Sequence, residues 1–135
     1  MTAPTRDLEA TARSILAEGR GILAADESTG TMSKRLEGQG IESTEESRRR
    51  FRELMFTTEG IEQWIGGVIL YDETIRQSTS DGTPIPQYLA QRGIAPGIKV
   101  DTGAKPLAGS PDEKVTEGLD GRRPFHQVAD GHHHR

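Results

Sequence analysis

Acidic side chains follow three short apolar runs of this chain, at Asp26, Asp72 and Asp101. The runs are the hydrophobic parts of "GILAADESTG", "GGVILYDETI" and "GIKVDTGA". A carboxylate at the end of a buried strand can mark a functional site, or it can form a turn or cap the next helix. For any single position the turn or cap is the better explanation. Three such positions, with Lys99 shortly before the third, favour a shared site.

The elements that must position these acids alternate between strands and helices. Helical spacing of apolar residues, or start and stop residues, indicates helices over 6–18, 43–56 and 86–92, with a short helical turn around 31–36. Continuous apolar runs predict strands at 22–25, 68–71 and 98–100. This alternation is typical of βαβ units and a parallel sheet, in which the strand ends lie together. In a β/α barrel, functional groups occupy the carboxyl ends of the strands.

The strongest helix signal lies in "STEESRRRFRELMF". Ser43 and Glu46 have the spacing of a capping box, in which each side chain satisfies a free backbone N–H. Phe51, Leu54 and Met55 form an apolar stripe expected to face the core. The arginines of "SRRRFR" are interpreted as a solvated helix face rather than a nucleic-acid patch.

Composition restricts the class of protein. The 135 residues are 32% hydrophobic and 28% charged, so the core needs a partner surface or more chain to be completed. The net charge of −4 argues against nucleic acid or an anionic membrane as a partner. No apolar run is long enough to span a membrane, no secretion signal is evident and cysteine is absent. A cytoplasmic location is expected.

Three long segments resemble the N-terminal part of class I fructose-bisphosphate aldolases: "GILAADESTGTMSKRL", "IGGVILYDETIRQSTSDGTPIP" and "GIKVDTGAKPLAGSPDEKVTEGLDG". The resemblance runs from Leu8 to Gly121. It implies an α/β fold, namely the first three or so β/α units of a (β/α)₈ TIM barrel, from a family that is usually homotetrameric. It implies reversible cleavage of fructose 1,6-bisphosphate to dihydroxyacetone phosphate and glyceraldehyde 3-phosphate through a lysine Schiff base. Neither a metal nor a cofactor is implied.

The resemblance assigns roles to individual residues. Asp26 matches the aspartate that orients the imine and handles protons. Ser28 and Thr31 match hydroxyls that contact the substrate phosphate, and Thr31 stands where serine is common. Lys99 matches an active-site lysine that binds substrate phosphate.

Two further basic residues, Lys34 and Arg35, match positions near the phosphate-binding end of the cleft. Arginine can bind a phosphate through two parallel hydrogen bonds. Glu27, Asp72 and Glu73 lie on the same rim and are given no catalytic step.

The family barrel has eight strands, and its Schiff-base lysine lies on the sixth. We therefore expect a partial barrel domain over 1–121, a non-homologous tail over 122–135, and no aldolase activity in this chain alone. One choice of codons for "RPFHQVADGHHHR", read from the second base, encodes "ARFTKWRTVITI", which is close to the strand-four segment of the family. We expect a frameshift with a small deletion after "GLDGR", which would also explain His132–His134 without a function.

Two alternatives to an enzyme remain. The chain could be a non-catalytic fragment, or an accessory piece that associates with full-length aldolase chains. A complete small phosphate-binding domain is disfavoured, because "STGTMSKR" lacks the glycine–lysine spacing of a P-loop.

Overall fold

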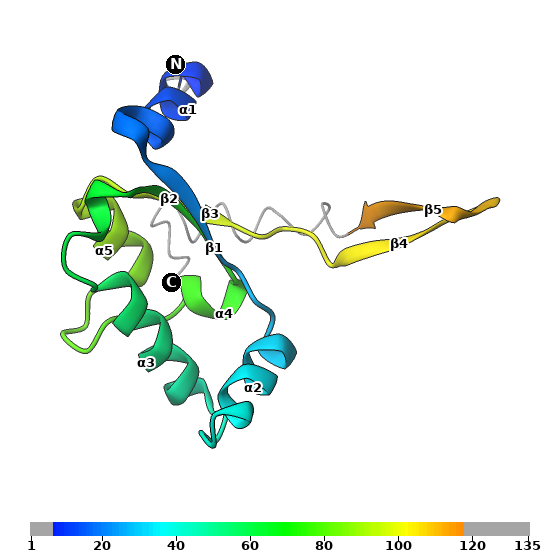
Figure 1. Ribbon diagram of the computed structural model, residues 1–135, viewed down its shortest axis with the longest axis horizontal. Helices are drawn as coiled ribbons and strands as arrows, with labels where there is room; N and C mark the ends of the chain where they lie inside the picture. The colour runs from blue at the N-terminus through cyan, green and yellow to red at the C-terminus, as the bar shows by residue number, and fades with distance from the viewer. Residues whose placement is uncertain (1–6, 118–135) are drawn as a thin grey trace, which may run out of the picture.

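A parallel sheet of three strands forms the centre of the molecule. The computed structural model describes residues 7–117; the predicted tail over 122–135, with its histidines, lies outside this range. The strands are β1 (Gly21–Ala25), β2 (Ile65–Leu70) and β3 (Ala95–Ile98), in the order β1-β2-β3 (Figure 1). Ala25 is in register with Leu70, and Leu70 with Ile98, so the three carboxyl ends lie at one edge of the sheet. The predicted parallel sheet is confirmed.

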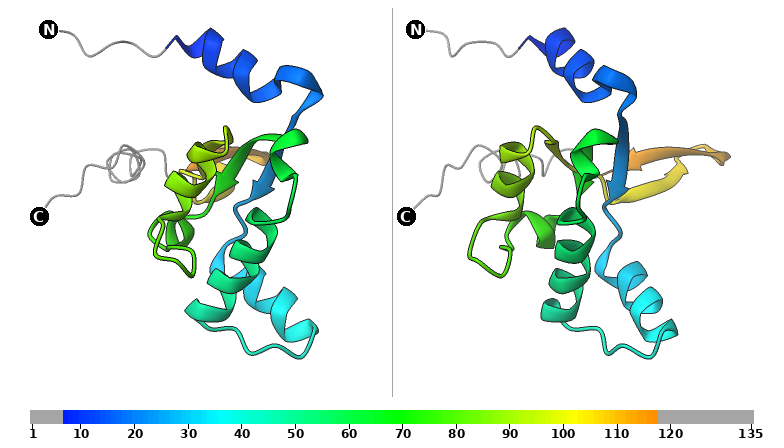
Figure 2. Two further views of the ribbon diagram at one scale, coloured as in Figure 1. Left: turned by 90° about the vertical axis from the view of Figure 1, so that its left-hand side faces the viewer. Right: turned by 60° about the vertical axis from the view of Figure 1, so that its left-hand side comes forward.

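In the described part of the chain, five α-helices accompany this sheet and an antiparallel hairpin follows it. The helices are α1 (Leu8–Leu16), α2 (Thr29–Gly38), α3 (Glu45–Phe56), α4 (Asp72–Ile75) and α5 (Ile85–Gln91), with short 3-10 turns η1 (Ala17–Gly19) and η2 (Ile61–Gln63). The hairpin consists of β4 (Gly103–Leu107) and β5 (Ser110–Glu117), and it extends away from the sheet in Figures 1 and 2. None of the described helices has the length and apolar character needed to cross a membrane.

The third strand was predicted three residues too late. The prediction followed the β-branched run at 98–100, whereas the structure pairs Ala95–Ile98 with the end of β2. Lys99 lies just past the strand, and its N–H still donates to the carbonyl of Leu70 at 2.9 Å. This last hydrogen bond holds the backbone of Lys99 at the carboxyl edge of the sheet.

The capping box of α3 is shifted by one residue from the prediction. Thr44, not Ser43, is the N-cap, and its hydroxyl accepts from the N–H of Ser47 at 3.0 Å. The hydroxyl of Ser47 in turn accepts from the N–H of Thr44 at 2.8 Å, so Glu46 takes no part in the box. Glu46 instead pairs with Arg49.

The buried face of α3 also differs from the predicted stripe. Leu54 is 72% exposed and Phe51 39% exposed, whereas Arg52 and Phe56 are buried. The interpretation of "SRRRFR" as a solvated face was therefore wrong for three of its four arginines: Arg48, Arg49 and Arg52 turn inward, and Arg50 is exposed. The reason is that the inward arginines find acceptors on other elements, described below.

The core lies between the sheet and the helices α3 to α5. Its fully buried apolar members are Ala25, Phe56, Val68, Leu70, Ile75, Ile85, Leu89 and Ile94. The side of the sheet nearest α1 is much less covered, since α1 buries none of its residues and Ile22 and Trp64 are 54% and 71% exposed. Both β1 and β3 pair on one side only within the described residues. The fold is thus an open part of a β/α barrel, as the sequence predicted.

Candidate functional site

The loop that follows β1 and the first turn of α2 carry three of the residues expected to form a site. Asp26 comes directly after the last residue of β1, and Ser28 is the N-cap of α2. The hydroxyl of Ser28 accepts from the N–H of Thr31 at 3.4 Å and donates to its hydroxyl at 3.2 Å. The two hydroxyls predicted to contact phosphate therefore lie side by side in the first turn of α2.

Asp26 and Lys99 approach each other across the end of the central strand. Lys99 Nζ lies 3.9 Å from Asp26 Oδ2, and both side chains are about one-third exposed, at 31% and 27%. One residue follows β1 and the other follows β3, so their side chains reach over β2, which lies between them. Partial exposure leaves room for a substrate anion beside the ammonium group, which a buried ion pair would exclude.

The remaining two predicted residues are placed differently. The guanidinium of Arg35 binds the carboxylate of Glu27, with Nη1 2.5 Å from Oε2, although the Arg35 side chain is 63% exposed. Lys34 is exposed and makes no hydrogen bond or ion pair with any described residue. The structure thus joins Asp26 to Lys99 in one contact, while Arg35 is held by an acid to which no role had been assigned.

A buried arginine beneath this loop was missed by the sequence analysis. Arg52 of α3 is 0% exposed, and its Nη2 donates to the backbone carbonyl of Glu27 at 2.6 Å. Burial lowers the pKa of Arg52, and the nearby carboxylates of Glu27 and Glu73 oppose that effect. The only sequence signal is an arginine four residues before Phe56, on what proves to be the inward face of the helix.

A second arginine links α3 to the residues after β2. Arg48 Nε and Nη2 donate to the two carboxylate oxygens of Glu73, at 2.8 and 3.0 Å, and Nη1 donates to the hydroxyl of Ser43 at 2.9 Å. The hydrogen bonds that Arg48 donates to Glu73 raise the pKa of Arg48. Such bidentate pairs fix geometry as well as adding energy. Glu73, on the same rim as Asp26, therefore serves to hold α3 in place.

Asp72 and Asp101, the other two acids at strand ends, have local roles. Asp72 begins α4 and binds Arg76 one turn later, at 2.8 Å. Asp101 accepts from the N–H of Gly103 at 2.9 Å, which starts the hairpin. The turn explanation was correct for Asp101. Asp72 is not a cap, because Tyr71 is the N-cap of α4, but its carboxylate is also held locally, by Arg76. Of the three acids, only Asp26 forms an ion pair with a lysine that follows another strand.

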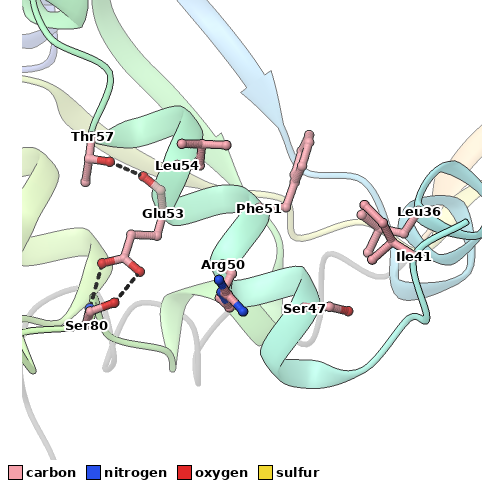
Figure 3. A pocket seen from close by; sticks show the side chains of 9 residues that line it. All are labelled: Leu36, Ile41, Ser47, Arg50, Phe51, Glu53, Leu54, Thr57 and Ser80. Carbon is pink, nitrogen blue, oxygen red and sulfur yellow. Dashed lines mark hydrogen bonds between the residues drawn. The ribbon is translucent and has the colours of Figure 1, made fainter. Parts of the chain in front are cut away.

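An open groove of about 580 Å³ lies elsewhere, between α2 and α3, and contains none of the predicted site residues. Figure 3 shows Phe51 and Leu54 on one side of it, with Leu36 and Ile41 on the other. Its polar members are Ser47, Arg50, Glu53, Thr57 and Ser80. The groove offers apolar surface and has no acid–base pair resembling that of Asp26 and Lys99.

Comparison with known proteins gives one consistent result. The family model described as fructose-bisphosphate aldolase class-I matches residues 7–128. A probable fructose-bisphosphate aldolase class 1 of Xanthomonas campestris is 60% identical over 86% of this chain and 35% of its own length. Fructose-bisphosphate aldolase C of Carassius auratus is 53% identical over 89% of this chain and 33% of its own.

A solved structure agrees with these sequence relatives. Fructose-bisphosphate aldolase from Plasmodium falciparum, in a ternary complex with TRAP and a small-molecule inhibitor, has a TM-score of 0.79 and 40% identity. The similarity covers 88% of this chain and 35% of that one. The chain therefore spans about a third of the length of the relatives it matches.

Proposed function

Because the chain belongs to the class I fructose-bisphosphate aldolase family, we propose that it contributes the first-strand acid and one phosphate-binding region of an aldolase site. The reaction is reversible cleavage of fructose 1,6-bisphosphate to dihydroxyacetone phosphate and glyceraldehyde 3-phosphate. The observation that carries this proposal is the meeting of Asp26 and Lys99 over the end of β2, at 3.9 Å. A contact at the carboxyl ends of the strands agrees with the place that active sites occupy in β/α barrels.

The roles follow from the chemistry of each group. Lys99, partly exposed, supplies a positive charge for a substrate phosphate, and the hydroxyls of Ser28 and Thr31 add donors beside the start of α2. The amino end of a helix favours an anion because its backbone N–H groups are free and its dipole is positive there. Asp26 keeps the ammonium group oriented and is available to exchange protons with the reacting centre.

Two further basic residues are proposed for the same phosphate region. Arg35 reaches phosphate only by leaving Glu27, to which it is bound at 2.5 Å. Lys34 is exposed and able to approach without breaking a contact among the described residues. We therefore expect Lys34 to assist phosphate binding at low ionic strength and Arg35 to do so only after an exchange of partners.

The covalent step requires a lysine that the family places on its sixth strand, and the described sheet has three strands. We propose that this 135-residue chain alone binds a sugar phosphate weakly and does not cleave it. The test is a titration of the ¹⁵N-labelled chain with dihydroxyacetone phosphate, followed at the amides of 28–31 and 99. Saturable shifts that disappear in Lys99→Met, and persist in Lys114→Met on the distant hairpin, support the proposal.

Borohydride trapping provides the second half of this test. With dihydroxyacetone phosphate and borohydride, we expect no stable covalent adduct on the purified chain. An adduct at Lys99 would contradict the proposal that Lys99 binds phosphate and that the Schiff-base lysine lies on a later strand of the family barrel. The absence of any shift on titration would contradict the phosphate role itself.

An accessory role is the second candidate function, and the uncovered side of the sheet favours it. β1 and β3 each have an unpaired edge within the described residues, and Ile22 and Trp64 are exposed beside them. Such edges and apolar surfaces promote pairing with other chains. Size-exclusion chromatography with a full-length aldolase tests this role, because an accessory chain must co-elute with it.

The finer features of the family are also proposals for this chain. We infer a cytoplasmic location, a sugar-phosphate partner and assembly with further aldolase chains in a homotetrameric family. The net charge of −4 speaks against nucleic acid or an anionic membrane as a partner. The division between a barrel part ending at residue 121 and an out-of-frame tail stays a prediction; sequencing the DNA through the codons for Arg122 and Arg123 tests it.

A further inference from the structure

Arg52 is an unusual residue for the place it occupies. Within residues 7–117 it is the largest side chain that is fully buried, and it lies one turn before Phe56 on the inward face of α3. Its Nε and Nη1 atoms are buried without a partner among the described residues. Burying a charged group in this way is costly, and a methionine of similar length would pack there without that cost. The position therefore calls for an explanation other than stability.

The one hydrogen bond that the Arg52 side chain makes with the described residues indicates what that explanation is. Its Nη2 donates to the carbonyl of Glu27 at 2.6 Å, the one hydrogen bond between α3 and residues 26–28. Glu27 is the residue between Asp26 and Ser28. Because the acceptor is the backbone, the contact fixes the path of the chain and not merely one side chain.

We propose that Arg52 is a positioning residue for the loop 26–28, through which α3 sets the relative placement of Asp26 and the first turn of α2. Asp26 lies at the start of this loop and faces Lys99, while Ser28 lies at its end and caps α2. With the carbonyl of Glu27 held between them, both ends of the loop keep their orientation when a ligand binds. The effect on phosphate binding rests on the proposed function, and the effect on the loop does not.

Charged groups around Arg52 support a role in fixing geometry. The carboxylates of Glu27 and Glu73, which follow β1 and β2, attract its positive charge and raise its pKa. Arg48, on the same helix, repels that charge and lowers the pKa. Arg48 is itself locked onto Glu73 by two hydrogen bonds. These bonds hold α3 against the region after β2. Arg52 therefore binds the loop after β1 from a helix that is itself fixed in position.

The decisive variant is Arg52→Met in the full 135-residue chain, with Arg50→Met as the matched control. Arg50 lies on the same helix, is exposed and makes no hydrogen bond with the described residues. For Arg52→Met we expect a urea midpoint equal to or above that of the unmodified chain, because the buried charge is removed. The amide of Met32, which donates to the carbonyl of Ser28 at 2.9 Å, should exchange about tenfold faster with solvent.

A phosphate titration adds the functional readout. Inorganic phosphate should bind Arg52→Met about tenfold more weakly than the unmodified chain, and Arg52→Lys should recover part of the loss because its ammonium group retains donors. A merely structural role would lower the urea midpoint and leave the loop unchanged in the folded protein. A urea midpoint that does not fall, together with a loosened loop, is therefore the specific signature.

The outcomes separate the two proposals. Unchanged exchange at Met32, or phosphate affinity within about twofold of the unmodified chain, overturns the positioning role. Failure of the unmodified chain to bind phosphate overturns the proposed function, while the exchange measurement still decides the role of Arg52. Should Arg52→Met not fold, Arg52→Lys takes its place: faster exchange supports the role, and unchanged exchange contradicts it.

Discussion

Replacing Glu53 by glutamine should destabilise the chain in a manner that depends on pH. Glu53 of α3 accepts from the Ser80 N–H at 2.6 Å, from the Ser80 hydroxyl at 2.8 Å and from Arg49 Nη1 at 2.8 Å. Figure 3 shows the carboxylate between α3 and the loop that carries Ser80. This carboxylate therefore fastens the loop between α4 and α5 to the outer side of α3.

The hydrogen bonds also shift the titration of this group. The N–H of Ser80 lowers the pKa of Glu53 below its ordinary value of 4.5; the Ser80 hydroxyl and Arg49 add to the effect, and burial opposes it. A carboxylate whose pKa is lowered in the folded state stabilises the fold above its ordinary pKa. That stabilisation is lost as the pH falls through the lowered folded value.

The expected magnitude follows from the contacts. Glutamine keeps one acceptor oxygen, but its amide nitrogen faces a donor where the second carboxylate oxygen was. The loss of charge-assisted hydrogen bonds should lower the free energy of unfolding by about 2 kcal/mol at pH 7. With a urea dependence of roughly 1–3 kcal/mol per molar for a protein of this size, the midpoint should fall by about 1 M.

The assay is urea unfolding followed by circular dichroism, for both proteins, from pH 7 down to pH 3. The difference in unfolding free energy should be constant at neutral pH. It should shrink below about pH 4.5, because the unfolded chain then binds a proton at Glu53 that the folded chain binds only at lower pH. Glu37→Gln on α2 is the control, since Glu37 is exposed and its side chain forms no hydrogen bond or ion pair with the described residues. A difference that stays constant across the whole range would refute the reasoning.

Two further substitutions test how α1 and the first strand are held. Gly66→Ala should lower the free energy of unfolding by about 2 kcal/mol or more, because a Cβ there would lie 1.7 Å from the carbonyl oxygen of Ile15. Gly38→Ala is the control and should not destabilise the chain, because a Cβ there meets nothing within 4 Å. Arg20→Met should cost about 1–3 kcal/mol, since this guanidinium donates to the carbonyls of Ser14, Ala17, Glu62 and Gly93. Arg13→Met, which removes only an exposed pair with Glu9, should change the urea midpoint little.

The strands and most helices could be predicted because their signals are local. A continuous apolar run flanked by glycine, such as that of β1 or β2, is sufficient to indicate a strand, although only β2 is mostly buried, and β1 leaves Ile22 and Ala24 exposed. The predicted capping box was wrong by one residue because Ser43, Thr44 and Ser47 all carry a hydroxyl that can cap a helix. Which of them caps α3 depends on the direction in which the chain enters the helix. The hairpin of β4 and β5 was not predicted, since nearly all its residues are exposed and show no apolar alternation.

The orientation of α3 could not be predicted because it depends on acceptors far away in the sequence. Apolar spacing alone predicts that Phe51 and Leu54 face inward. In the structure the inward side instead carries Arg48 and Arg52, whose acceptors are Glu73 and the carbonyl of Glu27. A single sequence holds no sign that these groups, each 25 residues from its donor, become neighbours.

The three acids at the strand ends show why residue type does not decide function. Asp72 is followed at once by helix, so its carboxylate binds Arg76 within α4. Asp101 is followed by a turn that contains Gly103, and the carboxylate of Asp101 accepts a hydrogen bond from the N–H of Gly103. Asp26 is followed by two further residues before α2 begins, and the backbone of that interval is held by Arg52 instead of by the acid itself. Of these three acids, only Asp26 is therefore left with its carboxylate near a lysine that follows another strand, and this freedom from local bonding supports the role in proton exchange that we propose for it.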